Sequence, residues 1–383
     1  MKKVGFITPE YPHPKVSYAA GIGTSIKNLA ITLVKKGVGV TVFVYHQKED
    51  AIIEDAGVII HLIAKKTYRF LTWYHYRLQL QNYINKVVKE QGIDVLEAPD
   101  WTGITAFMRF NVPLFIRLHG SDAYFCKLEK RKQKFKNFLF EKLALKNAHA
   151  FIAPTTFAGI ETQKIFGLDK KKIRTIHYGL KLEDFENETP EIYSRNTILY
   201  IGTIIRKKGV FELAEIFNTI IETNPSAKLI LIGRDAEDIK TGNMSTCALI
   251  EKTLSDKAKT QTKYLGSIDY SLVKEHIKNA HVCVFPSYAE TLGMVTIESM
   301  ALQKPVVNTS IGWAQELIDD TINGFLVHPS QRDLFANRIM ALLDDEALCL
   351  KIGKSARLKV EKLFDINKNA DINLEYYQSV LDS

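Results

Sequence analysis

The strongest constraint on the fold of this chain is an alternation of short apolar strands with longer amphipathic helical patterns. In the first half, strands are predicted at residues 4–8, 38–45, 58–63, 93–98, 114–119, 149–155 and 173–179. Helices are predicted between some of them, at residues 22–37, 72–92 and about 127–147. Because parallel strands need crossover connections, this order predicts a parallel sheet with helices on both faces.

The same alternation restarts after a polar segment at residues 180–196, which is the predicted linker. Strands are predicted at residues 197–202, 228–233, 262–266, 281–287, 304–309 and 324–329, with helices from about 209 and at about 293–303. We therefore expect two α/β units. Ligands of such open sheets bind beyond the carboxyl ends of the strands, so a cleft between the two sheet edges is the expected active site.

Cysteine spacing and the lengths of the apolar stretches exclude several protein classes. The four cysteines are far apart and form no CxxC pair, so we expect neither a zinc site nor a disulfide framework. The N-terminus has only a short apolar run before Pro9, which disfavours a signal peptide. No stretch approaches the ~20 apolar residues of a spanning helix. We expect a cytoplasmic protein that is not integral to a membrane.

Positive charge is concentrated in the first half. Residues 1–185 hold 29 Lys and Arg against 16 Asp and Glu, a net +13, whereas the remaining residues have a net −5. Two stretches, at 65–77 and 127–140, interleave the cations with Tyr, Trp and Phe. This pattern suits an anionic membrane surface or single-stranded nucleic acid, and a solvated surface without a partner is the third interpretation.

The most informative segment is PSYAETLGMVTIESMALQKPVV, residues 286–307. A predicted strand ends there, a loop carries Glu290, and Gly293 precedes a helix that carries Glu298. The first backbone amides of that helix suit a phosphate or sugar oxygens. They belong to Leu292, Gly293, Met294 and Val295. Glu290 would accept hydrogen bonds from sugar hydroxyls and Glu298 from a ribose. The alternative makes both glutamates ordinary solvated carboxylates.

This segment resembles the signature of the retaining glycosyltransferases of family 4, which have the GT-B fold. Two glutamates eight positions apart flank a glycine-containing loop in that family, and Glu290, Gly293 and Glu298 match them. Thr291 stands where the family usually has glycine, and Leu292 where it has phenylalanine.

Other segments resemble the same family in the same order. AGIGTSIKNLA at 20–30 resembles its glycine-rich loop, with Gly21 and Gly23 matching as donor-binding glycines. LHGSDAY resembles its histidine-containing segment, which implies that His119 contacts the donor sugar. Residues 176–185 and 323–329 match two further family segments. A dinucleotide fingerprint is disfavoured because the loop follows its strand late and lacks a third glycine.

The resemblance implies two Rossmann-like domains that face each other across a cleft. Residues 1–185 would bind the acceptor, residues 186–364 the nucleotide sugar, and a final helix at about 365–383 would pack back on the first domain. The implied reaction moves a sugar from a nucleoside diphosphate sugar to a glycan or lipid-linked acceptor with retention, as a hexosyltransferase in surface polysaccharide or lipopolysaccharide synthesis. The base and the sugar stay open.

Two rival functions remain beside this one. A nucleotide-sugar epimerase of GT-B fold is the enzyme alternative, and a basic nucleic-acid-binding protein is the non-enzymatic one. The family-like loops disfavour the first, and the lack of a recognised nucleic-acid motif disfavours the second. The preferred partners are therefore a sugar donor, an acceptor and an anionic membrane surface met by the first domain.

A cationic loop at residues 203–209 is the predicted clamp on the donor diphosphate. The family keeps an arginine just after the strand glycine, where this chain has Thr203, and a lysine that Lys208 matches. We infer that Arg206 replaces the missing arginine, because a guanidinium binds phosphate oxygens in bidentate fashion. The acidic stretch at 235–238 is interpreted as a solvated loop, so we expect catalysis without a metal or any other cofactor.

Overall fold

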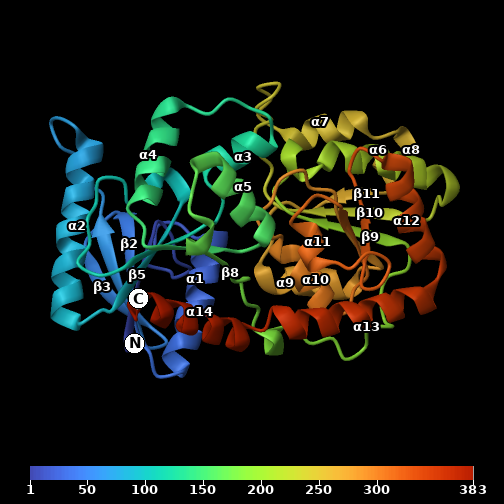
Figure 1. The fold of residues 1–383 in the computed structure, drawn as a ribbon. Helices are drawn as coiled ribbons and strands as arrows, with labels where there is room; N and C mark the ends of the chain where they lie inside the picture. Colours follow the sequence, from blue (N-terminus) through green and yellow to red (C-terminus); the bar gives the residue numbers. More distant parts are fainter. Residues whose placement is uncertain (383) are drawn as a thin grey trace. The chain divides into compact units, whose positions relative to one another are not determined.

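A computed structural model describes residues 1–382, which form two compact units (Figure 1). The first unit comprises Met1–Lys181 together with the C-terminal segment from Phe364, and the second comprises Leu182–Leu363. Each unit is built on one sheet with helices around it, so the predicted α/β fold class with parallel sheets is confirmed.

The sheet of the first unit has the strand order β3-β4-β2-β1-β5-β6-β7-β8. The strands are β1 (Lys3–Thr8), β2 (Gly39–Gln47), β3 (Ala51–Asp55), β4 (Val58–Ala64), β5 (Val95–Pro99), β6 (Leu114–Arg117), β7 (Ala150–Ala153) and β8 (Ile173–Thr175). All neighbours pair in parallel except β3, which pairs with β4 in antiparallel register. The sequence did not predict β3, a partly exposed edge strand.

Helices cover both faces of this sheet. They are α1 (Gly21–Lys35), α2 (Thr72–Gln91), α3 (Asp122–Leu128), α4 (Phe135–Lys146), α5 (Thr156–Phe166) and α14 (Ile366–Leu381). The predicted single helix at about 127–147 is wrong, because the chain breaks into α3 and α4. Lys130 adopts a left-handed φ of 54°, and the amide of Arg131 donates back to the carbonyl of Cys126 at 2.9 Å.

Two apolar cores lie on opposite faces of the first sheet. Side chains alternate between faces along a strand. Val42 and Val44 of β2 therefore join one core, and Phe43 and Tyr45 join the other. Burial on both faces explains why β2 is apolar almost throughout rather than alternating, as expected for a parallel strand.

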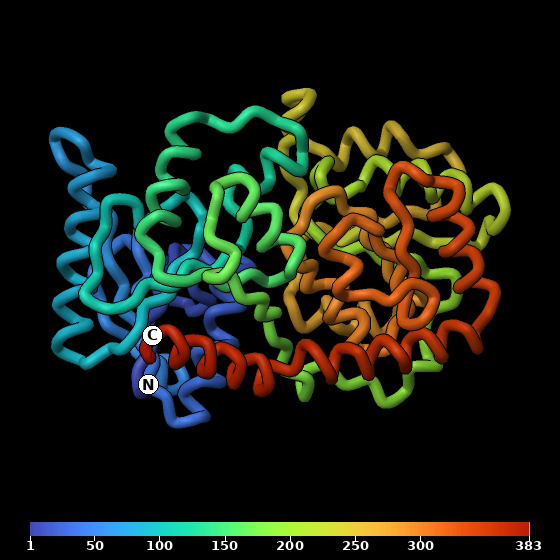
Figure 2. The backbone as a smooth tube through the Cα atoms, in the orientation of Figure 1, coloured from blue at the N-terminus to red at the C-terminus, as the bar shows by residue number. Residues whose placement is uncertain are grey.

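The C-terminal helix α14 packs on the first unit through a buried polar network. The Arg117 guanidinium pairs with Glu97 at 2.6 Å and donates to the Asn373 side chain at 2.6 Å, and the Tyr377 hydroxyl donates to Glu97. The N-terminal ammonium also donates to Gln378 at 2.6 Å, and Figure 2 shows the two chain ends side by side. Because Arg117, Glu97, Asn373 and Tyr377 are buried and hydrogen-bonded to one another, the network fixes where α14 sits.

The sheet of the second unit is fully parallel, with the order β11-β10-β9-β12-β13-β14. Its strands are β9 (Thr197–Ile201), β10 (Lys228–Ile232), β11 (Thr262–Tyr264), β12 (Val282–Phe285), β13 (Val306–Thr309) and β14 (Phe325–Val327). The order reverses between β9 and β12, and such a reversal opens a crevice at the carboxyl ends of the two strands.

The helices of the second unit flank this sheet, and one large apolar core contains side chains from both. They are α6 (Val210–Thr223), α7 (Thr246–Thr253), α8 (Asp256–Thr260), α9 (Tyr270–Asn279), α10 (Met294–Ala301), α11 (Ala314–Leu317), α12 (Arg332–Asp344) and α13 (Glu346–Leu363). No helix within residues 1–382 combines the length and apolar character needed to cross a membrane.

Candidate active site

The crevice between β9 and β12 gathers the strongest sequence motif of the second unit. After β12 the chain forms a loop through Glu290 and enters α10 at Gly293, whose φ of +93° lies in the left-handed region that favours glycine. Within the described residues, no side chain accepts from the amides of Met294 and Val295. Since the first amides of a helix lack helical partners, this end of α10 can receive an anion.

Lys208 and Glu290 form an ion pair at this crevice, each side chain about 20% exposed. Lys208 ends a short 3-10 turn, Arg206–Lys208, that follows β9. Gly209 has φ +71°, and a Cβ there would overlap the carbonyl of Pro286. The amide of Tyr288 also donates to the backbone carbonyl of Lys207 at 2.7 Å. Close packing of the two loops therefore brings together a lysine and a glutamate that lie far apart in the sequence.

A small pocket opens beside this pair in the second unit. Its lining residues are Ile201, Lys208, Phe285, Ser287, Glu290, Gly293, Val295, Thr296, Asn308 and Trp313. The pocket thus contains a cation, a carboxylate and the start of α10. The predicted residues Lys208, Glu290, Gly293 and Val295 all line it, whereas the Leu292 side chain is buried, with 1% exposure.

Glu298 faces the interior rather than solvent, against the interpretation of an ordinary solvated helix carboxylate. Only 8% of the residue is exposed, and the Tyr270 hydroxyl donates to its Oε1 at 2.6 Å. Burial raises the pKa of Glu298 to about 7, while the Tyr270 hydrogen bond and the Lys274 charge act in the opposite direction. Contact of Glu298 with a ribose stays a prediction.

Arg206 is engaged by Asp238, in the loop that follows β10. Its Nε and Nη2 donate to the two carboxylate oxygens at 2.9 and 2.7 Å, and its guanidinium lies 4.1 Å from the centre of the Phe211 ring. Asp238 is only 2% exposed, so the interpretation of residues 235–238 as a solvated loop is wrong at this position. The Arg206 hydrogen bond holds the pKa of Asp238 down to about 2. Reach of Arg206 to a diphosphate stays a prediction.

In the first unit, a carboxylate of the chain accepts a hydrogen bond at the glycine-rich start of α1. The amide of Gly23 donates to Oε1 of Glu10 at 2.7 Å, and a Cβ on Gly23 would lie 2.9 Å from the Glu10 backbone. Burial raises the pKa of Glu10, against the hydrogen bonds from Gly23 and Ile22. The Gly23 amide is therefore engaged within the chain, and donor binding by Gly21 and Gly23 stays a prediction. Nothing lies within 4 Å of a Cβ on Gly21.

His119 lies just beyond the carboxyl end of β6. Its ring stacks on Tyr178 with centroids 5.4 Å apart, and the Tyr178 hydroxyl is 2.7 Å from its Nδ1. Burial and the Arg117 charge lower the pKa of His119 to about 3, so the ring is neutral. Beside it, the Gly120 amide donates to the buried Asp100, and burial raises the pKa of that carboxyl to about 8.

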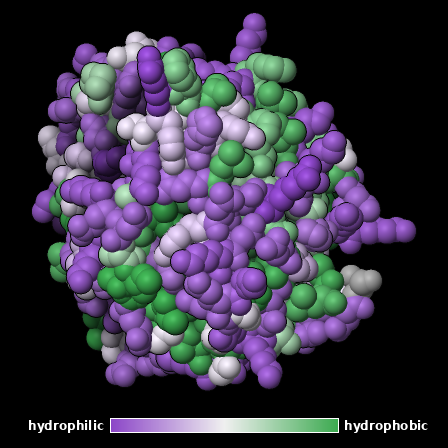
Figure 3. Space-filling view, turned by 90° about the vertical axis from the view of Figure 1, so that its left-hand side faces the viewer, coloured by the Kyte–Doolittle hydropathy of each residue, from purple (hydrophilic) through white to green (hydrophobic). Residues whose placement is uncertain are grey.

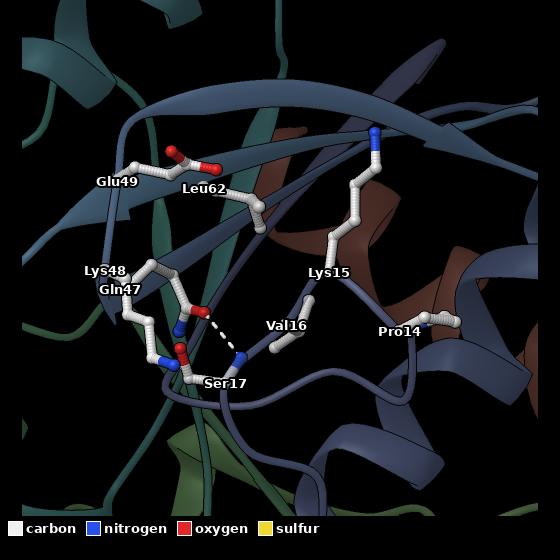
Figure 4. A pocket seen from close by; sticks show the side chains of 8 residues that line it. All are labelled: Pro14, Lys15, Val16, Ser17, Gln47, Lys48, Glu49 and Leu62. Atoms are coloured by element: carbon white, nitrogen blue, oxygen red, sulfur yellow. Dashed lines mark hydrogen bonds between the residues drawn. The ribbon is translucent and has the colours of Figure 1, made fainter.

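The first unit also has an open pocket at the ends of β2 and β4 (Figure 4). It is lined by Pro14, Lys15, Val16, Ser17, Gln47, Lys48, Glu49 and Leu62. Gln47 accepts from the Ser17 amide at 2.9 Å and donates to the Tyr45 carbonyl at 3.0 Å. These bonds hold the loop after β1 against β2, and two lysines and a glutamate lie around the opening.

Three residues that sequence reasoning missed complete these sites: Glu10, Tyr270 and Asp238. Glu10 follows β1 by two positions, a place where carboxylates often face a ligand crevice, so a local signal existed. Tyr270 and Asp238 meet their partners across 28 and 32 residues, and nothing local predicts those contacts. Within residues 1–382, His, Cys, Asp and Glu form no group of three or more that suits a metal ion.

Two family models together match nearly the whole chain. The model "Glycosyltransferase Family 4" matches residues 19–184, and "Glycosyl transferases group 1" matches residues 183–359. An uncharacterised glycosyltransferase of Methanocaldococcus jannaschii is 25% identical over 346 residues, covering 89% of each chain. The capsular polysaccharide biosynthesis glycosyltransferase CapM of Staphylococcus aureus is 28% identical over 213 residues, which is 54% of this chain and 49% of CapM.

Solved structures share the fold over the full length. Sucrose-phosphate synthase from Thermosynechococcus elongatus superposes with a TM-score of 0.82 at 21% identity, covering 100% of both chains. HepE from Anabaena, in complex with UDP, gives a TM-score of 0.75 at 18% identity and covers 99% of this chain and 100% of its own. At these identities the likeness shows the fold.

Proposed function

The chain belongs to the glycosyltransferases of group 1 and family 4, and we propose that it transfers a sugar from a nucleoside diphosphate sugar to a glycan or lipid-linked acceptor, with retention of configuration. The expected family and its GT-B fold are confirmed. The observation that carries the proposal is the pocket in which Lys208, Glu290 and the start of α10 converge.

In this proposal the donor diphosphate lies at the start of α10. The amides of Met294 and Val295 and the Lys208 ammonium would bind its oxygens. When the bond between the sugar and the diphosphate breaks, the electron pair stays on the departing oxygen, and preorganised donors stabilise that charge. Glu290 would accept from the sugar hydroxyls while it keeps Lys208 in place. We propose that these groups stabilise the leaving diphosphate without a metal. The transferred sugar is proposed to be a hexose.

His119 is proposed as a sugar contact from the first unit. Tyr178 engages Nδ1, and a neutral imidazole can hydrogen-bond to a hydroxyl through Nε2. The pocket of Figure 4 is proposed to take part in acceptor binding, because its lysines suit a phosphorylated or acidic glycan. CapM is named for capsular polysaccharide biosynthesis, which supports a role in a surface polysaccharide.

The test of this function starts from the purified full-length chain and a panel of nucleoside diphosphate sugars. A ligand that binds only the folded form raises the unfolding temperature, so the matching donor is identified first. Product formation with lipid-linked and oligosaccharide acceptors follows, and the anomeric signal in an NMR spectrum reports retention or inversion. Activity abolished by EDTA and restored by magnesium would contradict metal independence. Epimerised donor in the absence of acceptor would favour an epimerase.

We also propose that the first unit associates peripherally with anionic membrane. Trp73, Phe107 and Phe140 form an aromatic cluster with centroids 5.0–5.9 Å apart, and Phe135 nearby is 79% exposed. Figure 3, which faces the side that carries α2, shows hydrophobic patches within a mostly hydrophilic surface. The exposed Lys132, Lys134 and Lys136 surround Phe135. Rings and cations together suit lipid headgroups.

Flotation with vesicles of phosphatidylcholine, with and without phosphatidylglycerol, tests this association. Binding should require phosphatidylglycerol and fall steeply at 1 M salt, where screening shortens to about 3 Å. Replacing Lys132, Lys134 and Lys136 with alanine should abolish it. The exposed triplet Lys170–Lys172 in the same unit gives a control variant with the same loss of charge, which should still bind. If both variants lose vesicle binding equally, the association depends on net charge and not on the lysines around Phe135.

A further inference from the structure

Tyr270 is held in a defined position at the start of α9. The Asp269 side chain caps this helix by accepting from the Ser271 amide at 2.9 Å. One turn later, the Lys274 ammonium lies 5.5 Å from the centre of the Tyr270 ring and 4.6 Å from that of Phe185, and donates to the Asp184 carbonyl at 3.0 Å. The cap and the pinned lysine fix the direction in which the tyrosine ring leaves the helix.

The hydroxyl of Tyr270 donates to one oxygen of Glu298, while half of the tyrosine remains exposed. A carboxylate accepts through both oxygens, so Oε2 of Glu298 is left for a ligand. A phenol oxygen that donates one hydrogen bond can still accept another. The pair therefore offers two acceptors side by side, one on the largely buried Glu298 and one on the half-exposed Tyr270.

We propose that Tyr270 and Glu298 together recognise the two neighbouring hydroxyls of the donor ribose, and that Tyr270 is a specificity-determining residue for ribonucleotides. One hydroxyl donates to Oε2 of Glu298, and the other donates to the Tyr270 oxygen, while the Tyr270 hydroxyl keeps its hydrogen bond to Oε1 of Glu298. This inference rests on the proposed nucleotide-sugar function and adds a second contact to the predicted one. A tyrosine that only supported Glu298 would not touch the ribose.

Calorimetric titration of the full-length chain with UDP, GDP and ADP identifies the nucleotide that binds, and its 2′,3′-dideoxy analogue serves as the second probe. We expect Tyr270→Phe to bind the ribonucleotide about tenfold more weakly than the wild type, as for the loss of one hydrogen bond. Its affinity for the dideoxy analogue should change by less than about twofold. Tyr193→Phe is the matched control, because Tyr193 lies in the same unit against the His281 ring, at the amino end of β12. It should bind both probes as the wild type does.

A loss of affinity for the ribonucleotide alone supports a ribose site formed by both Tyr270 and Glu298. Equal weakening for both probes, or no weakening, overturns it and leaves Tyr270 as a support for the fold. Glu298→Gln gives a second measurement, since it too should discriminate between the probes, and Tyr270→Phe should add little to it in the double variant. If titration of the wild-type chain with UDP, GDP and ADP gives no heat above the buffer control, the proposed nucleotide-sugar donor is contradicted, and this inference fails with it.

Discussion

The two units each begin a helix with glycines after a strand, and the two helix starts differ in what they contact. In the first unit, Glu10 accepts from the amide of Gly23 and closes the start of α1. In the second, Glu290 in the loop before α10 pairs with Lys208, and among the described residues no side chain caps the start of α10. Similar glycine patterns therefore encode a closed helix start in one unit and an open one in the other.

This difference teaches that a glycine-rich loop does not by itself make an anion site. Glycine at position 23 is required because the Glu10 backbone approaches closely. Gly293 instead permits a left-handed turn that aims the start of α10 into a pocket. A helix start can bind the anion of a ligand only where no carboxylate of the chain already accepts from its amides.

The largest effect is expected at the open helix start. Lys208→Ala should lower kcat a hundredfold to a thousandfold, about 2.7–4 kcal/mol, because one preorganised donor to the leaving diphosphate is lost. Lys207→Ala, in the same 3-10 turn, should change kcat little. Steady-state kinetics with unfolding temperatures for both variants measure this. A Lys208→Ala enzyme with wild-type turnover would show that the start of α10 is not the diphosphate site.

The next effect concerns pH and the buried carboxyl of Glu298. An unfolded glutamate loses its proton near pH 4.5, whereas burial raises the pKa of the folded group to about 7. Between these values the folded state binds more protons. The free energy of unfolding therefore falls as pH rises from about 4.5 through 7, by up to about 3 kcal/mol for this group.

Urea unfolding across this pH range checks the prediction. Glu298→Gln cannot titrate, so its stability should exceed that of the wild type increasingly toward neutral pH. The exposed Glu251→Gln on α7 is the control and should track the wild type. Parallel curves for Glu298→Gln and the wild type would contradict a raised pKa for the buried carboxyl of Glu298.

A smaller effect is expected at the ion pair of Arg206 and Asp238, which joins two loops of the second unit. Arg206→Ala leaves the buried Asp238 without its cation, so the free energy of unfolding should fall by about 1.5–3 kcal/mol. Asp238 engages two of the guanidinium nitrogens, so if both stay paired when the donor binds, kcat should fall less than about fivefold. Asp238→Asn should destabilise the chain by a similar mechanism. A hundredfold loss of kcat in Arg206→Ala at unchanged stability would instead place Arg206 on the diphosphate.

The sequence predicted most of the fold, because its strands and helices are signalled by local periodicity. It missed β3, whose charged last two residues and partial exposure give a weak strand pattern, and the break between α3 and α4, which contains neither Gly nor Pro. For the site, the motif around Gly293 predicted Glu290, Gly293 and Val295, and the loop at 203–209 predicted Lys208, among the residues that line the pocket. The partners of Glu298 and Arg206 could not be predicted, because those contacts depend on how separate loops pack.

The smallest effect separates two glycines at the closed helix start. In Gly23→Ala the new Cβ would lie 2.9 Å from the Glu10 backbone, so overpacking should cost about 1–2 kcal/mol of stability. In Gly21→Ala nothing lies within 4 Å of the Cβ, and stability should change by less than about 0.5 kcal/mol. Urea unfolding of both variants measures the contrast. If Gly21→Ala nevertheless loses activity while it stays as stable as the wild type, a ligand reaches the start of α1 through Gly21. The first unit would then bind substrate there despite the carboxylate of Glu10.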